Sequence, residues 1–96
     1  MPLSALLRDR RDAILEIAAR CGARNVRVFG SFARGTADGA SDVDFLIDLE
    51  PGRSLLDVGA MLMALQDLLG RDVDVVTERG LKQRMKDRVL AEAVPL

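Results

Sequence analysis

Four residues between positions 30 and 44 have the chemistry to bind a phosphate chain and a metal ion. Gly30 and Ser31 follow an alternating stretch, and Asp42 and Asp44 come after ten intervening residues. Glycine lets a phosphate approach the backbone closely, and a serine that begins a helical turn offers N–H groups and a hydroxyl to an anion. Two carboxylates in a D-x-D pattern on a strand point to one face, where they form an oxygen-rich site for one or two Mg²⁺ ions.

A later apolar stretch, residues 73–76, offers a third carboxylate. Asp74 lies between two valines inside this predicted strand, whereas Asp72 precedes it. An acid held within a strand is better positioned than one at its rim, so we predict Asp74 as the third metal-site residue and keep Asp72 as the alternative. Arg34 lies one helical turn beyond Ser31 and either forks onto a phosphate or pairs with the acidic turn that follows it.

Helices and strands of recognisable periodicity must hold these residues. We expect an α/β, two-layer domain in the order α-β-β-α-β-α, with a small mixed sheet packed on helices, and residues 1–96 forming a single domain. The predicted helices are 2–21, 31–34, 54–69 and 81–94, and the predicted strands are 25–29, 42–49 and 73–76. Ser54 and Asp57 form a variant of the capping box at the start of the third helix, and Gly70 ends it.

Composition excludes several kinds of active site. The chain has no histidine, which rules out Ser-His triads, histidine zinc sites and histidine general bases. Its single cysteine, Cys21, cannot form an internal disulfide, so we expect a packing role for it and a reducing cytoplasm for the protein. No apolar run approaches the ~20 residues that cross a membrane, and no signal-peptide pattern is present. The remaining groups, chiefly carboxylates, hydroxyls and backbone amides, favour Mg²⁺ chemistry.

Charge is unevenly distributed along the chain although the net charge is only −1. Residues 36–50 carry five acidic and no basic side chains, whereas residues 79–92 carry five basic and two acidic ones. The near-zero net charge argues against general nucleic-acid binding. An acidic pocket beside a basic tail suits a metal and a polyphosphate, but a solvated helix has the same pattern. For the basic side chains of this tail we favour a solvated or partner-facing surface: Lys82, Arg84, Lys86 and Arg88.

The segment from Gly30 to Asp44 resembles the signature of the minimal nucleotidyltransferases of the DNA-polymerase-β-like superfamily. It reads G-S-F-A-R-G and then S-D-V-D, and the later R-D-V-D-V-V-T resembles the strand that carries their third acid. The resemblance implies that Asp42 and Asp44 bind Mg²⁺ and that Asp74 completes the site and orients or deprotonates the attacking hydroxyl. It also implies that Gly30 and Ser31 hold the triphosphate of the nucleotide.

A domain this small resembles the antitoxin of MNT–HEPN toxin–antitoxin pairs. The resemblance implies transfer of AMP from ATP to a tyrosine hydroxyl of a partner HEPN ribonuclease toxin, with release of pyrophosphate. The partner, or self-association into a homo-oligomer, is expected to complete the site. The alternative is a non-catalytic module of the same fold that masks the toxin or binds nucleotide. Transfer to a small molecule would call for an additional substrate domain, and a D-x-D glycosyltransferase would need a longer chain.

Overall fold

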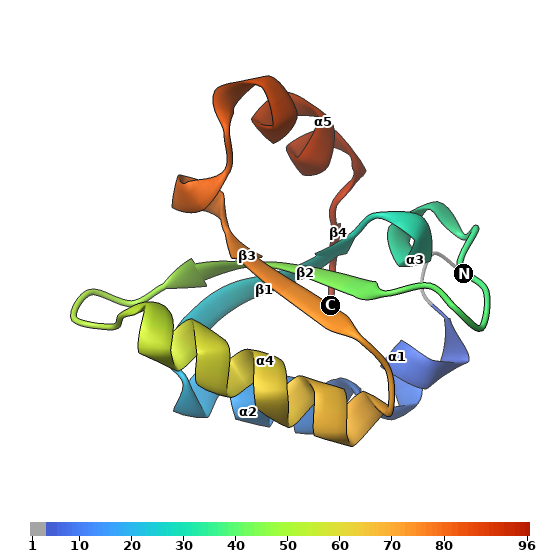
Figure 1. Ribbon diagram of the computed structural model, residues 1–96, viewed down its shortest axis with the longest axis horizontal. Coiled ribbons are helices and arrows are strands. Elements are labelled where there is room, and N and C mark those ends of the chain that lie inside the picture. The colour runs from blue at the N-terminus through green and yellow to red at the C-terminus, as the bar shows by residue number, and fades with distance from the viewer. Residues whose placement is uncertain (1–3) are drawn as a thin grey trace.

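The computed structural model describes residues 4–96 and has an α/β architecture built on one mixed four-stranded sheet (Figure 1). The helices are α1 (Ala5–Asp9), α2 (Arg11–Arg20), α3 (Ser31–Arg34), α4 (Leu55–Leu69) and α5 (Gln83–Glu92), with a 3₁₀ turn η1 (Glu78–Gly80). The strands are β1 (Ala23–Phe29), β2 (Val43–Leu49), β3 (Val73–Thr77) and β4 (Val94–Pro95). The predicted fold class, a small mixed sheet packed on helices, is confirmed.

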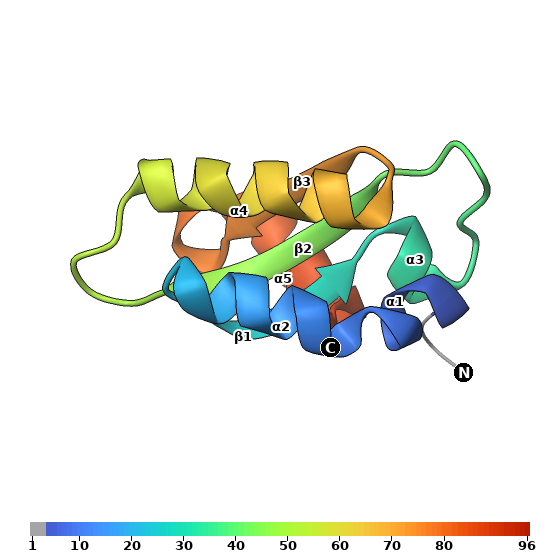
Figure 2. The ribbon, with the colours of Figure 1, turned by 90° about the horizontal axis from the view of Figure 1, so that it is seen from below.

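The strands lie in the order β3-β2-β1-β4, so that β2 and β1 are the central pair. Strand β1 runs antiparallel to β2 and to β4, and β2 runs parallel to β3. A parallel pair needs a crossover connection, and α4 supplies it. Figures 1 and 2 show α2 and α4 on one face of the sheet and α5 over the opposite face. Helices therefore lie on both faces of the sheet (Figures 1 and 2).

The hydrophobic core lies between the sheet and the pair α2 and α4. The alternate residues Val43, Phe45 and Ile47 of β2 are fully buried there, as the period of two predicts. Burying an aliphatic or aromatic side chain contributes about 1.5–3 kcal/mol, so this face stabilises β2 in its central place. Leu46 points to the opposite face and is also fully buried, and Val89 of α5 is 2% exposed. The face that carries the acidic residues is thus covered in part by α5.

The boundaries of α4 agree with the capping signals in the sequence. Ser54 Oγ accepts a hydrogen bond from the N–H of Leu56, and the Asp57 carboxylate accepts one from the N–H of Ser54. Gly70 ends the helix in the left-handed conformation, with φ of 67°. No helix within residues 4–96 has the length and apolar character needed to cross a membrane.

The N-terminal helix is divided, which corrects the prediction of one continuous helix over residues 2–21. The break lies at Arg10, with φ of −104° and ψ of 7°. Residues 8–12 are five consecutive charged residues, so no apolar side chain holds this turn against the core. Leu7 and Ile14, on either side of the break, are both fully buried. Residues 2 and 3 of the predicted helix lie outside the described residues.

Two further boundaries differ from the prediction: the start of β1 and the end of α5. Strand β1 begins at Ala23, before the predicted start, because the pairing with β2 continues across an irregularity in which Asn25 has φ of 52°. Helix α5 is shorter than the predicted span 81–94, and Val94 and Pro95 instead form β4 against β1. Proline biases the preceding residue towards extended backbone and suits an edge strand. Pro95 therefore indicated an extended Val94, a signal that the predicted helix did not take into account.

Candidate active site

The loop after β1 takes its shape from Gly30. This residue has φ of 74° and ψ of −152°, a conformation that is essentially restricted to glycine. A Cβ at this position would also overlap Oδ2 of Asp44. Ser31 to Arg34 form the single helical turn that the sequence predicts, and Gly30 accepts hydrogen bonds from the N–H groups of Ala33 and Arg34. In the structure, the group that approaches the glycine closely is therefore the Asp44 carboxylate.

The turn before Asp42 is held by Arg71. Its Nη1 donates to the backbone carbonyls of Asp38 and Ser41 at 3.2 and 3.1 Å, and its guanidinium lies 5.2 Å from the centroid of the Phe32 ring. Hydrogen bonds from Ala40 and Ser41 lower the pKa of the Asp38 carboxyl, so this acid is committed to the turn. The turn delivers Asp42, exposed, to the start of β2.

Two carboxylates face each other across the parallel pair of strands. Asp44 of β2 and Asp74 of β3 are direct register partners, and Phe29 of β1 pairs with Asp44 on its other side. Register partners on neighbouring strands project to the same face of the sheet, so the two carboxylates share one face, on strands about 4.8 Å apart. Asp72 lies outside β3, and its backbone carbonyl accepts a hydrogen bond from the N–H of Val43 at 3.1 Å. Between the two candidates for the third carboxylate, Asp74 lies beside Asp44.

Excess negative charge marks this part of the molecule. The pKa of Asp44 is raised to about 6, first by burial and then by the neighbouring carboxylates of Asp74, Asp42 and Glu92, and Arg34 opposes the shift. A cation would relieve both the desolvation and the repulsion. The donor set consists of carboxylate oxygens, which Mg²⁺ prefers. The residues present therefore fit a divalent ion of this kind.

One cavity of about 370 Å³ brings together five of the six predicted site residues. The five are Gly30, Ser31, Arg34, Asp42 and Asp44. The sixth, Asp74, does not line the cavity but adjoins Asp44 in the sheet. Within residues 4–96, no three His, Cys, Asp or Glu side chains are close enough to form a ready-made metal site. The three-carboxylate metal site thus stays a prediction, and its two members on neighbouring strands are the best placed.

Helix α5 supplies residues that the sequence analysis missed. Met85, Arg88, Val89 and Glu92 line the same cavity. Arg88 was expected on a solvated or partner-facing surface. Arg34 pairs with Glu92, at 3.2 Å between Nη1 and Oε2, and not with the acidic turn that the alternative proposed. The four residues are spaced at i, i+3, i+4 and i+7, which is one face of a helix, so the periodicity was the available signal.

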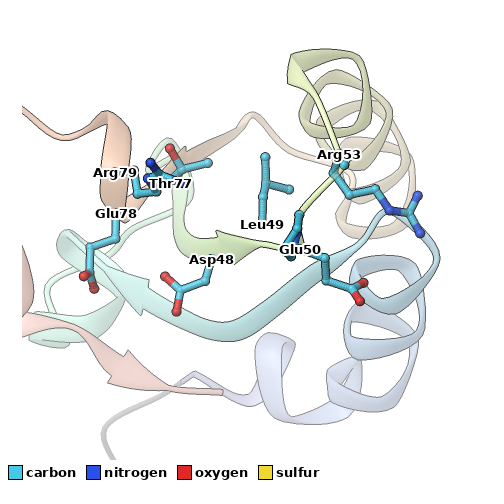
Figure 3. Close-up of a pocket in the computed structure, with 9 residues that line it drawn as sticks. Asp48, Leu49, Glu50, Arg53, Thr77, Glu78 and Arg79 are labelled. Carbon is cyan, nitrogen blue, oxygen red and sulfur yellow. The ribbon is translucent and has the colours of Figure 1, made fainter.

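A larger cavity of about 550 Å³ lies at the other end of β2, away from the predicted residues. Figure 3 shows its lining, with the carboxylates of Asp48, Glu50 and Glu78 and the guanidinium of Arg53. Two of these acids hold Arg27, which is only 9% exposed: its Nη2 and Nη1 lie 3.0 Å from Asp48 and Glu78. Asp48 and Glu78 thus form an ion-pair network with Arg27 that joins β1, β2 and η1.

A strand ending in a Gly-Ser turn, next to a D-x-D strand on a small mixed sheet, defines a nucleotidyltransferase type of site. Residues 11–96 match the family described as the nucleotidyltransferase domain. This match covers most of the chain, and the chain therefore belongs to the nucleotidyltransferase domain family. The resemblance that the sequence motifs indicated is confirmed, and the chain is a nucleotidyltransferase.

Known proteins extend this likeness over most of the chain. Protein adenylyltransferase MntA of Thermococcus cleftensis is 43% identical over 79 residues, which cover 82% of this chain and 80% of the relative. A solved structure provisionally described as a minimal nucleotidyltransferase is 54% identical with a TM-score of 0.85, covering 94% of this chain and 92% of that one. A toxin–antitoxin crystal structure with AMP-PNP has a TM-score of 0.76 at 20% identity and covers 88% of this chain and 69% of that one. This last likeness concerns the fold.

Proposed function

We propose that this chain is a Mg²⁺-dependent protein adenylyltransferase, an antitoxin that transfers AMP from ATP to a tyrosine hydroxyl of a partner HEPN ribonuclease toxin. The observation that carries the proposal is the register pairing of Asp44 with Asp74 beside the cavity lined by Gly30, Ser31 and Arg34. A relative of high identity bears the name protein adenylyltransferase, and a toxin–antitoxin structure with AMP-PNP has the same fold. In this proposal residues 1–96 form a single minimal domain that acts in the cytoplasm.

The acidic residues are assigned to the metal. Asp42 and Asp44 hold one or two Mg²⁺ ions, and Asp74 is the third carboxylate of the site. A bound divalent ion neutralises the triphosphate and the leaving pyrophosphate. The raised pKa of Asp44, about 6, supports this assignment because a carboxylate crowded by other acids gains from a nearby cation.

The reaction joins the acceptor hydroxyl oxygen to the α-phosphorus of ATP and breaks the bond from that phosphorus to the oxygen bridging to the β-phosphate. Pyrophosphate leaves with the electron pair of the broken bond. Asp74, which is exposed on β3, orients the hydroxyl or accepts its proton. Ser31 and Arg34 hold the triphosphate through a hydroxyl and a guanidinium, so catalysis is mainly positioning and charge stabilisation and needs no histidine.

Intact-mass spectrometry tests the proposal directly. The protein encoded next to this chain is incubated with the chain, ATP and Mg²⁺, and each other nucleoside triphosphate is tested in parallel. We expect one or more AMP increments on the partner, and fragmentation then identifies the acceptor residue. The variant Asp42→Asn/Asp44→Asn should add none, while Asp87→Asn, an exposed change on α5 away from the cavity, should behave as wild type.

The competing function is toxin masking without catalysis. A stable complex of the two proteins with no mass increment from any nucleotide would favour masking. The same conclusion would follow if Asp42→Asn/Asp44→Asn still neutralised the toxin as well as wild type does. Loss of neutralisation in that variant, with the complex intact, would favour the enzyme.

A further inference from the structure

Glu92 joins both ends of the loop that the proposed function assigns to the triphosphate. Its Oε2 accepts a hydrogen bond from the N–H of Gly30 at 2.6 Å. Its two carboxylate oxygens also accept from Nη1 of Arg34, at 3.2 and 3.3 Å. Ser31 lies between these two anchor points and lines the same cavity. One carboxylate thus sets the position of the glycine peptide relative to the arginine side chain.

The backbone around Glu92 is itself fixed to the strand that carries the loop. Helix α5 ends at Glu92, and Val89, one turn earlier, is 2% exposed. Immediately afterwards Val94 of β4 pairs with Val28 of β1, and β1 runs on to Gly30. The carboxylate is therefore held from both sides, and it has little freedom to leave the loop.

Arg34 keeps its phosphate-binding edge in this arrangement. Only Nη1 contacts Glu92, and Nε and Nη2 make no hydrogen bond to any side chain or carbonyl within the described part of the chain. The Nε and Nη2 groups form one of the two-donor edges with which a guanidinium forks onto a phosphate. Because Arg34 is otherwise exposed, Glu92 is what restricts the rotamers of this long side chain.

The position of the Glu92 carboxylate is electrostatically unfavourable, and this cost argues that the residue has a role at the site. Glu92 adds a further carboxylate to a region that already holds Asp42, Asp44 and Asp74, and it contributes to the raised pKa of Asp44. An acidic side chain does not attract a triphosphate. Its benefit to this site is in orienting the two groups that it contacts.

We propose that Glu92 is a positioning residue for the nucleotide, holding Gly30 and Arg34 in the arrangement that receives the triphosphate. This inference rests on the proposed function. Removing the carboxylate should then weaken nucleotide binding, since Arg34 must be ordered anew each time ATP binds. If Glu92 instead only blocked the cavity, its removal would strengthen binding, so the sign of the change decides.

Calorimetric titration of the purified chain with ATP and Mg²⁺, with no acceptor present, measures the effect. We expect the Kd of Glu92→Ala to rise about tenfold. That of Glu92→Gln, whose amide oxygen can still accept from the Gly30 N–H and from Arg34 Nη1 as Oε2 does, should stay within about threefold of wild type. Glu92→Asp, too short to reach both partners, should resemble Glu92→Ala. Asp87→Ala on the exposed face of α5 is the control and should leave the Kd unchanged. In the background of Arg34→Ala, removing Glu92 should have a clearly smaller effect.

The transfer assay provides a second readout. Glu92→Ala should raise the KM for ATP about tenfold with kcat within about threefold of wild type, because the residue does not touch the reacting atoms. Equal or tighter ATP binding by Glu92→Ala would overturn the positioning role and leave the proposed function standing. Failure of the wild-type chain to bind any nucleotide would overturn the proposed function itself. If Glu92→Ala does not fold, as judged by circular dichroism, the comparison of Glu92→Gln with Glu92→Asp decides in the same way.

Discussion

Gly30 and Asp44 are packed so closely that no side chain fits on the glycine without overlapping Oδ2 of the aspartate. The contact joins the loop after β1 to the D-x-D strand, and it puts the loop and the half-buried carboxylate in one cavity. The glycine is therefore required both by its backbone conformation and by the carboxylate beside it.

Gly30→Ala should lower the free energy of unfolding by at least about 2 kcal/mol and reduce transfer activity roughly 100-fold, because it strains the backbone and displaces Asp44. Two other glycines separate these causes. Gly35 has φ of 78°, and among the described residues no atom beyond its chain neighbours lies within 4 Å of the place that a methyl group would take. Gly35→Ala should therefore cost only the backbone strain, about 1–2 kcal/mol. Gly39 has open space and no such φ, so Gly39→Ala should be near neutral. Urea denaturation and the transfer assay measure both effects, and equal losses at Gly30 and Gly35 would contradict the role of the contact.

Asp44→Asn should stabilise the metal-free protein at neutral pH. The pKa of Asp44 is raised from 3.8 to about 6, so between these values the folded state holds a proton that the unfolded state has lost. Stability therefore falls as the pH rises through this window, and removing the charge should recover about 1 kcal/mol at about pH 7.5 after allowance for solvent exposure. That gain corresponds to a Tm about 4–8 °C higher.

Thermal denaturation in the presence of a chelator tests this effect at about pH 7.5 and about pH 3.5. The difference between Asp44→Asn and wild type should nearly vanish at the lower pH, where the carboxyl is mostly protonated in both states. Asp67→Asn, an exposed change on α4, is the control and should not alter the Tm at either pH. A lower Tm for Asp44→Asn at about pH 7.5 would show that the carboxylate stabilises the fold and that its pKa is not raised.

Asp74→Asn should abolish most of the transfer activity, with a loss of about 100-fold or more, and leave the fold intact. Asp74 is exposed and lies beside Asp44 in the register of β2 and β3, so it combines access to the acceptor with proximity to the proposed metal site. Asp72→Asn is the matched change outside the strand and should keep activity within about threefold. Steady-state rates for the two variants decide the matter, and the reverse order of losses would move the third carboxylate to Asp72.

Arg27→Ala should lower the free energy of unfolding by about 2–3 kcal/mol. The guanidinium is nearly buried between Asp48 and Glu78, and its removal leaves two partly buried carboxylates without their cation. Arg24 on the same strand is exposed, so Arg24→Ala should change stability by less than about 0.5 kcal/mol. Urea denaturation of both variants makes the comparison. A change at Arg27 as small as that at Arg24 would mean that the network contributes little.

The features that could be predicted from the sequence are those encoded by neighbouring residues. Ser54, Asp57 and Gly70 specify the ends of α4 through contacts within a few positions, and the capping pattern of that helix was correctly expected. Alternation along β2 specified which side chains enter the core, since successive side chains of a strand point to opposite faces. The Gly-Ser and D-x-D pattern likewise predicted residues that line one cavity, because both lie at the ends of adjoining strands.

Tertiary structure decided what these elements meet. Glu92 reaches Gly30 across 62 positions of sequence, and no local pattern records that contact. It depends on β4, a two-residue strand that exists only because β1 offers it an edge, and that strand places the end of α5 over the site. The partners of Arg34 and Arg27 also come from distant elements. Local propensity and periodicity therefore determined the Gly-Ser and D-x-D motif and most elements of this protein, whereas long-range packing decided how the loop after β1 is held.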